Sequence, residues 1–370
     1  MIKKFELYIK DIVRGKRRGV FPFLIKTVLL PFSWLYGFGV HFRNQVYEKG
    51  WMRRYVPPVS LVVSVGNIVA GGTGKTPVTL LLAGAFYERF TVAILSRGYR
   101  SKAEKQDMPI LLCEGNGPVF PSSYCGDEPY VYAKRLPKSI IIVGGNRRKA
   151  SFLAARAGAQ AIFLDDGMQH RRVARDFDVV VVDIGDPFGH GYFLPRGFLR
   201  DTLKSFARAN LIILNHTQGD EQFAKVKAQL KPYSSAPVVG ANGSVADIKN
   251  LQGHHVVLQK KEKAGMFCTI ANPDYFKRTL EQSGFQVVNE FILPDHDSIR
   301  EKDLEHFAQA SLKSGASYLV CTEKDRVKLK DDLSLVLPVL WVQMNLQIVA
   351  GQEEWENFLK LAEAKIARGC

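Results

Sequence analysis

Apolar runs of strand length alternate with helix-length segments through the first half of this 370-residue chain. Most runs are continuous rather than alternating between apolar and polar residues, which is typical of strands buried on both faces of a parallel sheet. The predicted strands are 61–65, 92–96, 140–143, 161–164, 179–182 and 211–214, and the predicted helices are 77–87, 128–136 and 148–157. Their order predicts an α/β fold with helices on both faces of the sheet.

A change in local composition after residue 185 indicates a second domain. Prolines and glycines lie close together at Pro187, Gly189, Gly191, Pro195 and Gly197, which favours a loop. A second α/β series follows, with predicted strands at 238–239, 255–258, 266–270, 287–293, 318–322 and 339–342 and an amphipathic helix at 352–368. We therefore expect a first domain of residues 1–185 and a smaller α/β domain of residues 186–344. The C-terminal segment 345–370 is expected to pack back on the first domain.

The run Gly-Thr-Gly-Lys-Thr at residues 72–76 indicates what the first domain binds. It follows the strand 61–65 and precedes a helix that has Pro77 in its first turn. Glycines let the backbone wrap around an anion, and the helix N-terminus adds partial positive charge. Lys75 would reach the terminal phosphates of a nucleotide, and the Thr76 hydroxyl would hold Mg²⁺. Val69 stands where the strict pattern has a glycine, so a glycine-rich surface turn is the alternative.

The chain has a net charge of +15, and much of this positive charge lies near the N-terminus. Residues 1–60 contain twelve lysines and arginines against three acidic residues, mixed with many phenylalanines and leucines. Such a mixture favours a helix at a membrane surface. Residues 20–40 are apolar enough to suggest a span, but Lys26 lies inside them and Pro31 would interrupt a helix, so we expect surface contact without a span. A helix packed on the core is the alternative, and a nucleic-acid surface is a third use of the charge that no motif accompanies.

The remaining composition places the chain among intracellular globular proteins. Hydrophobic residues make up 46% of it, as in proteins with a packed core. The five cysteines stand singly, without the paired spacing of a zinc ribbon or a disulfide framework. This usage fits a reducing cytoplasm.

Two carboxylates follow the apolar strand 161–164, namely Asp165 and Asp166. Ligands of open α/β sheets bind at the carboxyl ends of the strands, and a carboxylate there is a usual Mg²⁺ partner of a phosphate loop. Asp183, after the strand 179–182, is a weaker competitor for this role. The alternative for Asp165 and Asp166 is a solvated Asp-Gly turn.

Two further motifs could supply a general base. Gly-Asp-Glu-Pro at residues 126–129 reads as a helix start, with an acidic residue at the cap, and Asp127 or Glu128 could instead act on an acceptor hydroxyl. His296 stands between Asp295 and Asp297, a setting that suits proton transfer, although a structural histidine is the commoner case.

Three basic or aromatic side chains follow predicted strands and could contact an anionic or sugar-bearing ligand. Arg97 and Tyr99 come after the strand 92–96, where a plain surface loop is nearly as good a description. Arg147 comes after the strand 140–143 and could direct a guanidinium at a transferred phosphoryl group.

Taken together, these motifs resemble the tetraacyldisaccharide 4′-kinase family, the lipid A 4′-kinases. The resemblance covers nearly the whole chain, and the pairing of the phosphate loop with Asp-Asp-Gly-x-Gln-His is highly specific. The similar segments are 31–36, 47–50, 64–67, 71–77, 95–99, 126–129, 164–170, 194–200, 294–296 and 322–325.

The resemblance implies transfer of the γ-phosphoryl group of ATP, with Mg²⁺, to the 4′-hydroxyl of tetraacyldisaccharide 1-phosphate, which forms lipid IVA. It implies a peripheral enzyme on the cytoplasmic face of the bacterial inner membrane, whose partners are the lipid acceptor and the membrane surface. We expect a monomer that binds no nucleic acid. The alternative function is a membrane-recruited P-loop ATPase that works as a switch.

The resemblance also implies roles for individual residues, by group. It implies an Asp–His dyad of Asp127 and His296 that deprotonates the acceptor, with Lys75 and Arg147 as further catalytic residues. The implied nucleotide-binding residues are Gly71, Gly72, Thr73, Gly74, Lys75 and Thr76. The implied metal-handling residues are Thr76, Asp165 and Asp166, and the implied acceptor-site residues are Asn67, Arg97, Tyr99, Gln169, His170 and Arg200.

The chain departs from the family pattern on the acceptor side. Asn146 replaces a frequent aspartate, Asp201 replaces a usual glutamate, and Asp297 and Ser298 stand where a second histidine is common. The segment 195–198, Pro-Arg-Gly-Phe, replaces a more usual Pro-Ala-Gly-Pro. These departures affect the expected contacts with the disaccharide more than those with the nucleotide.

Overall fold

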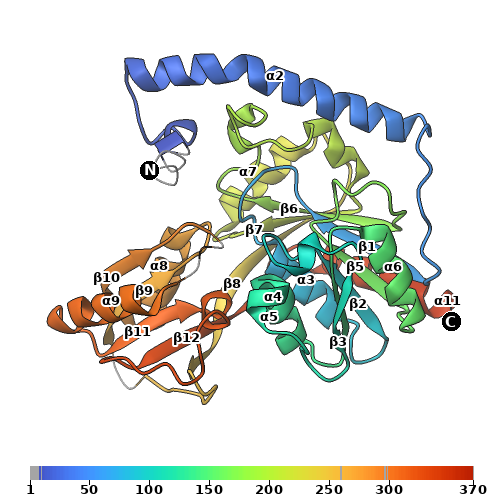
Figure 1. Ribbon diagram of the computed structural model, residues 1–370. Helices are drawn as coiled ribbons and strands as arrows, with labels where there is room; N and C mark the ends of the chain where they lie inside the picture. Colours follow the sequence, from blue (N-terminus) through green and yellow to red (C-terminus); the bar gives the residue numbers. More distant parts are fainter. Residues whose placement is uncertain (1–7, 10, 259–260, 296, 298, 370) are drawn as a thin grey trace. The chain divides into compact units, whose positions relative to one another are not determined.

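The computed structural model describes residues 8–9, 11–258, 261–295, 297 and 299–369. The chain forms two compact units, each assembled from stretches that lie far apart in the sequence (Figure 1). The first unit takes Met1–Lys75, Leu164–Asn242 and Ile348–Cys370, and the second takes Thr76–Phe163 and Gly243–Gln347. The domain division near residue 185 that the sequence suggests stays a prediction.

The first unit is built on parallel strands in the order β1, β6, β7 and β8. Their bounds are β1 Leu61–Gly66, β6 Phe177–Asp183, β7 Leu211–Asn215 and β8 Val238–Asn250, and β5, Ala161–Asp165, ends in this unit. Registers such as Val65↔Val179 and Val180↔Ile212 show the parallel pairing. These strands are buried almost throughout, as continuous apolar runs predict.

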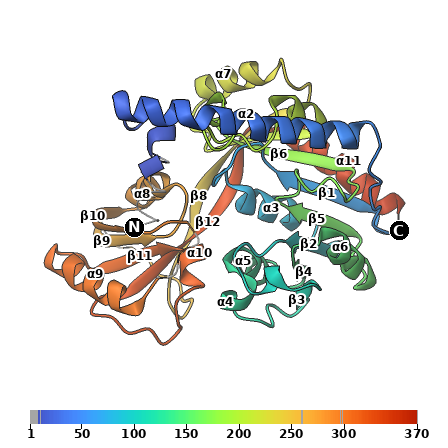
Figure 2. The ribbon, with the colours of Figure 1, turned by 45° about the horizontal axis from the view of Figure 1, so that its top comes forward.

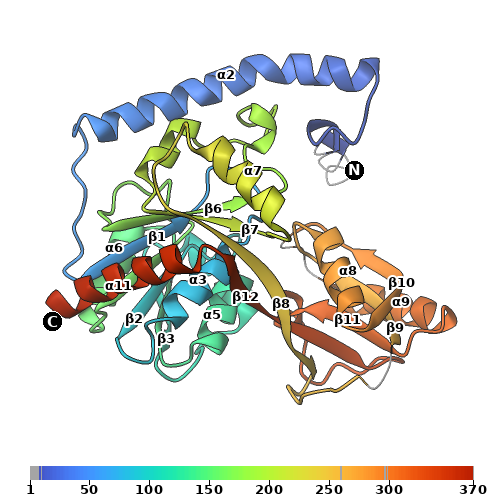
Figure 3. The same cartoon turned by 180° about the vertical axis from the view of Figure 1, so that it is seen from behind.

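Helices and a loop cover this sheet. The helix α7, Asp220–Leu230, contributes Val226 and Leu230 to a core that also contains Ile212 and Leu214 of β7. The helix α11, Gln352–Arg368, contacts β1 and is seen beside it in Figure 3. The loop after β6 carries the 3₁₀ turns η2, Gly189–Gly191, and η3, Leu203–Arg208.

The N-terminal helix α2, Val20–Glu48, is the longest element of the structure's described residues (Figure 2). The helix continues through Pro31, so the expectation that this proline interrupts it is wrong. The mean hydropathy of its most apolar 18-residue window is 1.5, and by length and composition alone the helix could cross a membrane. The buried positions Ser33, Gly37, Val40, Asn44 and Tyr47 are three or four residues apart, which is the spacing of one helix face.

The second unit contains two groups of strands. In one, β2, Val92–Ser96, pairs in parallel with β4, Ile140–Val143, and β3, Ile110–Glu114, joins β4 antiparallel. The helices with this group are α3 Lys75–Gly84, α4 Ser122–Cys125, α5 Asp127–Arg135 and α6 Arg147–Arg156, with the 3₁₀ turn η1 Ala103–Lys105.

The other strand group is parallel, in the order β10, β9, β11 and β12. The bounds are β9 Glu262–Cys268, β10 Phe285–Ile292, β11 Tyr318–Thr322 and β12 Val339–Ala350, with helices α8 Pro273–Gln282, α9 Glu301–Lys313 and α10 Glu323–Arg326. Helix α9 packs on Phe267 and Leu319, whereas α8 packs on Met266 and Val320. Because neighbouring strand residues point to opposite faces, the two helices cover opposite faces of this group.

The fold class agrees with the sequence, and three local features differ. The segment 255–258 is not a strand, since His255 forms only an isolated bridge to Lys249. Helix α3 ends at Gly84 rather than at residue 87. The strand β3 and the helices α7, α8 and α9 were not predicted, although β3 contains the continuous apolar run of residues 110–113.

Candidate active site

The phosphate loop lies in the first unit between Gly66, the last residue of β1, and Lys75, the first residue of α3. Asn67 is fully buried and donates from Nδ2 to Thr73 Oγ1 at 2.8 Å, which closes the loop on itself. Gly71 and Gly74 have φ of +123° and +86°, a region that side-chain-bearing residues rarely adopt. The loop therefore has the tight, glycine-dependent form that the sequence predicts.

Lys75 and Arg200 meet at the carboxylate of Asp166. The Lys75 Nζ lies 3.6 Å from Asp166 Oδ1, and Arg200 donates to both carboxylate oxygens at 2.7 and 3.0 Å. Arg200 also donates to Asn67 Oδ1. Burial alone would raise the pKa of Asp166, but the charge of Lys75 and the hydrogen bonds from Arg200 outweigh it and hold that pKa well below its usual range. Asp166 is therefore an ionised carboxylate that holds two cations beside the loop.

Two more predicted acceptor-site residues follow Asp166 in the chain. Gln169 donates from Nε2 to the main-chain oxygen of Asn67 at 2.8 Å, so it supports the start of the phosphate loop. His170 is half-buried, and its main-chain oxygen accepts from Arg175. Asp165 is buried at the end of β5. The expected roles of these residues toward acceptor and metal stay predictions.

In the second unit, Thr76 donates from Oγ1 to Glu128 Oε1 at 3.3 Å. Glu128 belongs to the first turn of α5, and Lys324 Nζ lies 3.5 Å from the same Oε1. Lys324 also lies 3.1 Å from Asp295 Oδ1. Burial would lower the pKa of Lys324, but Glu128 and Asp295 outweigh it and raise that pKa above the usual value, so the lysine stays charged.

A second lysine of this unit, Lys328, holds Asp127. Its Nζ lies 3.2 Å from Asp127 Oδ2 and 3.5 Å from the fully buried Asp325. Asp325 also accepts from the Thr269 hydroxyl at 2.6 Å, which anchors α10 to the end of β9. His296, the predicted partner of Asp127, lies outside the described residues, as does Ser298, and the dyad stays a prediction.

The other predicted side chains are spread over the same unit. Arg97 is about half exposed and forms an ion pair with Glu104 at 2.6 Å. Tyr99 is exposed, with the Arg100 guanidinium over its ring. Arg147, at the start of α6, is buried and donates to the main-chain oxygen of Gly144 at 3.0 Å. Their contacts with a ligand stay predictions.

In the second unit, Thr76 and Glu128 carry oxygens of the kind that Mg²⁺ binds. Among the described residues, no three His, Cys, Asp or Glu side chains gather as a ready-made cage. Beside nucleotide phosphates, however, Mg²⁺ keeps several waters and needs only one or two protein oxygens. Thr76 Oγ1 and Glu128 Oε1 are two such oxygens in mutual contact. In the first unit, the carboxylate of Asp166 is held by Lys75 and Arg200, and its expected role toward the metal stays a prediction.

The partners of several site residues escaped prediction from sequence. Glu128 and Lys324 stand in motifs that the sequence singles out, but nothing local shows that Glu128 faces Thr76. Asn215 donates from Nδ2 to the main-chain oxygen of Thr73 at 3.0 Å. Its only sequence signal is its position at the carboxyl end of the apolar strand β7, where ligand-binding side chains of α/β sheets gather.

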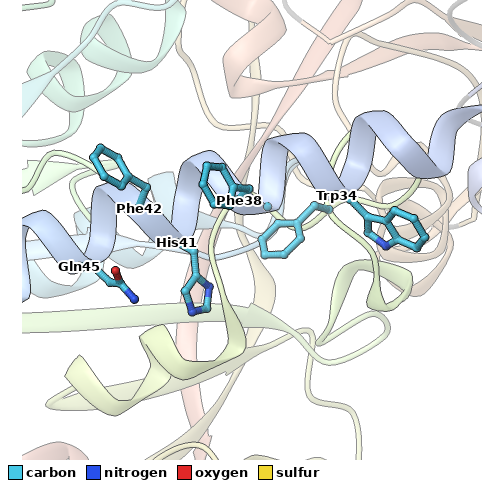
Figure 4. Close-up of a pocket in the computed structure, with 7 residues that line it drawn as sticks. Trp34, Phe38, His41, Phe42 and Gln45 are labelled. Atoms are coloured by element: carbon cyan, nitrogen blue, oxygen red, sulfur yellow. The ribbon is translucent and has the colours of Figure 1, made fainter.

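An apolar cavity of about 330 Å³ opens along α2 in the first unit. Figure 4 shows Trp34, Phe38, His41, Phe42 and Gln45 along one stretch of the helix. Gly37 and Phe193 complete the lining. A Cβ at Gly37 would lie 2.7 Å from the Phe193 ring, so the glycine lets that ring pack against the helix backbone.

Comparisons with known proteins agree over most of the chain. The family model described as tetraacyldisaccharide-1-P 4′-kinase (LpxK) matches residues 25–363. The tetraacyldisaccharide 4′-kinase of Halothermothrix orenii is 31% identical over 94% of this chain and 96% of its own. That of Syntrophotalea carbinolica is 34% identical over 95% of this chain and 96% of its own. The crystal structure of LpxK from Aquifex aeolicus in complex with ATP matches with a TM-score of 0.71 and 27% identity, over 92% of this chain and 99% of that one.

Proposed function

The chain belongs to the tetraacyldisaccharide 4′-kinase family, and from this premise we propose which of its residues carry out the transfer and where in the cell it takes place. It is an ATP-dependent kinase of lipid A biosynthesis whose acceptor is a lipid disaccharide. The reaction moves the γ-phosphoryl group of ATP to the 4′-hydroxyl of tetraacyldisaccharide 1-phosphate. None of the contacts above favours the alternative of an ATPase switch.

The phosphate loop is proposed to bind the ATP phosphates through the main-chain N–H groups of 71–76. Lys75 lies only 3.6 Å from Asp166 Oδ1 and can turn toward the β- and γ-phosphates, while Arg200 keeps Asp166 neutralised. Phosphoryl transfer needs little covalent chemistry from the protein, so positioning and charge stabilisation supply most of the rate. Arg147 is proposed to contribute charge near the transferred group.

Asp127 is proposed to accept the proton of the acceptor hydroxyl, together with His296. Lys328 lies at 3.2 Å from its carboxylate and keeps that carboxylate at the first turn of α5. Thr76 and Glu128 would hold Mg²⁺, which would neutralise negative charge on the phosphates when bound. Asp165 and Asp166 are proposed to handle the metal ion, as the family resemblance implies. The other residues proposed to line the acceptor site are Asn67, Arg97, Tyr99, Gln169 and His170.

The observation that carries this proposal is the closed phosphate loop with Lys75, Asp166 and Arg200 gathered beside it. The direct test incubates the protein with Mg²⁺, γ-labelled ATP and tetraacylated disaccharide 1-phosphate. We expect the label at the 4′-position of the lipid. Label that appears only as inorganic phosphate, with lipid present, would support the ATPase switch instead.

The Asp127→Asn variant is expected to lower kcat by about 10²- to 10⁴-fold, the usual range for a lost general base. The amide keeps the shape and an acceptor for Lys328 but cannot take a proton at neutral pH. The KM for ATP should change little. Asp220→Asn is the matched control, because Asp220 is likewise the first residue of a helix. Equal activity of the two variants would remove Asp127 from the mechanism.

Membrane association is supported by the family and by the apolar helix α2, and we propose that the enzyme binds the cytoplasmic face of the inner membrane peripherally. From Ser33 onward, one face of α2 packs on its own unit, where Arg43 and Asn44 bond the buried Asp201. Of the residues 20–32, none is buried. Arg196 donates to the Lys26 oxygen within this stretch. The stretch is only about 20 Å long at 1.5 Å per residue, shorter than the roughly 30 Å hydrocarbon core.

The outward face of α2 is the proposed contact with lipid. Leu35, Phe38 and Phe42 are exposed on it, and Phe38 and Phe42 also line the apolar cavity beside Phe193. Such an arrangement suits a helix that lies in the membrane interface with its other face on the protein. The cavity could take part of an acyl chain. Peripheral binding, a monomeric state and the absence of nucleic-acid binding stay predictions.

The double variant Leu35→Glu with Phe38→Glu is expected to weaken binding to anionic vesicles by tenfold or more, because two large apolar side chains lose their contact with lipid. The KM for the lipid acceptor should rise and the KM for ATP should not. Leu361→Glu, on the exposed side of α11, is the control. Protease sites on both sides of 20–40 that lie on opposite faces of a sealed vesicle would show a span and overturn the peripheral assignment.

A further inference from the structure

Behind the phosphate loop, three polar side chains from the ends of two neighbouring strands form a connected row. Asp183 is the last residue of β6, Asn215 is the last residue of β7, and His216 follows it directly. The parallel register of these strands pairs Asp183 with Asn215, which brings the row together. The kinase mechanism described above makes no use of any of these three residues.

The contacts of the row lead from Asp183 through His216 and Asn215 to the phosphate loop. His216 Nδ1 lies 3.3 Å from Asp183 Oδ2, and His216 Nε2 lies 3.4 Å from Asn215 Nδ2. The same Nδ2 group donates to the main-chain oxygen of Thr73 at 3.0 Å. Asn215 is almost completely buried. Its amide therefore has one hydrogen for the loop and one for the histidine.

The close approach of Asn215 explains a glycine of the loop. A Cβ at Gly74 would lie 1.9 Å from Asn215 Nδ2, and Gly74 has φ of +86°. His216 itself has φ of +64°, an uncommon conformation for a residue with a side chain. Such conformations persist where the surroundings hold them and gather at functional sites. The backbone of the phosphate loop at Gly74 therefore leaves the space that the Asn215 amide occupies.

The charge of Asp183 sets the orientation of the histidine. Burial would raise the pKa of Asp183, but the hydrogen bond with His216 outweighs it, and the net effect is a lower pKa. The Asn215 Nδ2 group is a donor, so the His216 Nε2 that it contacts accepts, and the ring hydrogen lies on Nδ1, which faces Asp183.

We propose that Asp183, His216 and Asn215 are positioning residues for ATP, which hold the Thr73–Gly74 peptide of the phosphate loop in its nucleotide-binding form. Asn215 acts on the loop directly, His216 fixes the orientation of Asn215, and Asp183 fixes that of His216. The proposal rests on ATP binding at this loop and does not depend on the identity of the acceptor. It gives Asp183 a role other than the metal contact considered for it from sequence.

The test measures the Kd for a non-hydrolysable ATP analogue and the KM for the lipid acceptor. Asn215→Asp keeps the shape but turns an oxygen toward the Thr73 oxygen, and it should raise the Kd about tenfold or more, as expected for one lost hydrogen bond. The KM for the acceptor should stay unchanged. Asn210→Ala is the control: Asn210 precedes β7 at its other end and accepts from the Asp178 N–H at 2.8 Å, so its loss lowers stability without reaching the loop.

Two substitutions of His216 separate the links of the row. His216→Gln keeps an acceptor near the Nε2 position, and its Kd should stay close to that of the unaltered protein. His216→Asn keeps a donor toward Asp183 but no acceptor for Asn215, and it should raise the Kd as Asn215→Asp does. Asparagine tolerates positive φ well, so strain would not explain that loss.

The outcomes distinguish failure of the positioning role from failure of the proposed ATP binding at the phosphate loop. If the unaltered protein does not bind the analogue, the assignment of the phosphate loop itself fails. If it binds, and Asn215→Asp binds equally well or affects ATP and acceptor to the same degree, the positioning role is wrong. Equal Kd values for the two His216 variants would show that His216 does not orient Asn215. The positioning role would then belong to Asn215 alone, and the proposed roles of His216 and Asp183 would be wrong.

Discussion

Lys75→Ala is expected to lower phosphoryl transfer by about 10³-fold or more while leaving the fold intact. A charge directed at the transferred phosphate acts mainly in the transition state, and loss of one such group typically costs about 10²- to 10⁵-fold. The fold should survive, because Asp166 keeps both hydrogen bonds from Arg200 when Lys75 is removed. Single-turnover transfer from γ-labelled ATP would measure the loss, and thermal denaturation would verify folding.

The matched control for this prediction is Lys138→Ala. Lys138 is also a lysine in contact with one carboxylate, at 2.7 Å from Glu88, but both side chains are more than half exposed. Exposed pairs of this kind contribute little to stability and none to a distant reaction. Turnover within a few-fold of normal in folded Lys75→Ala protein would show that the loop does not bind the phosphates as assigned.

Asp201→Ala is expected to cost about 3–5 kcal/mol of folding stability, the usual result of removing one partner from a buried ion network. The Asp201 side chain is fully buried and accepts from Arg43 at 3.1 Å, from Asn44 at 2.7 Å and from Arg208 at 3.3 Å. Without it, two guanidinium groups lose their shared carboxylate. Because Arg43 and Asn44 belong to α2, the helix should also come away from its unit.

Urea denaturation would measure this loss, and limited proteolysis between α2 and β1 would detect release of the helix. Asp303→Ala is the control, since Asp303 also pairs with an arginine at 2.7 Å but on the surface. That change should cost less than about 1 kcal/mol. If Asp201→Ala were no less stable than Asp303→Ala, apolar packing of α2 at Gly37 and Val40 would be its main attachment.

The features that the sequence predicted correctly are local ones. The strand β1, the glycine loop and the start of α3 follow one another within 61–76, so periodicity, glycine content and the position of Lys75 are enough to recognise them. The buried parallel strands β2, β4 and β11 are likewise recognisable from their continuous apolar runs. The family resemblance is likewise carried by contiguous motifs, and the comparisons confirm it.

The helix α2 marks the limit of such local reasoning. A proline is unfavourable inside a helix because it lacks an N–H and crowds the preceding turn, and this argued for a break at Pro31. The chain nevertheless forms one helix through it. Contacts on both sides of the proline support the helix: Arg196 donates to the Lys26 oxygen at 3.1 Å and Ser33 donates to the Phe193 oxygen at 2.7 Å. Both partners come from one loop, 170 and 160 residues away in the chain.

The sequence by itself therefore determined that this chain has a nucleotide loop, which fold class carries it and which family it resembles, because these depend on residues that are neighbours in the chain. Only the tertiary structure decided the partners of the site residues. Asn215 reaches the Thr73 oxygen across 142 residues and Glu128 reaches Thr76 across 52. A side chain has no sequence signal for a partner that distant, because the contact arises from the order and register in which the strands and helices pack.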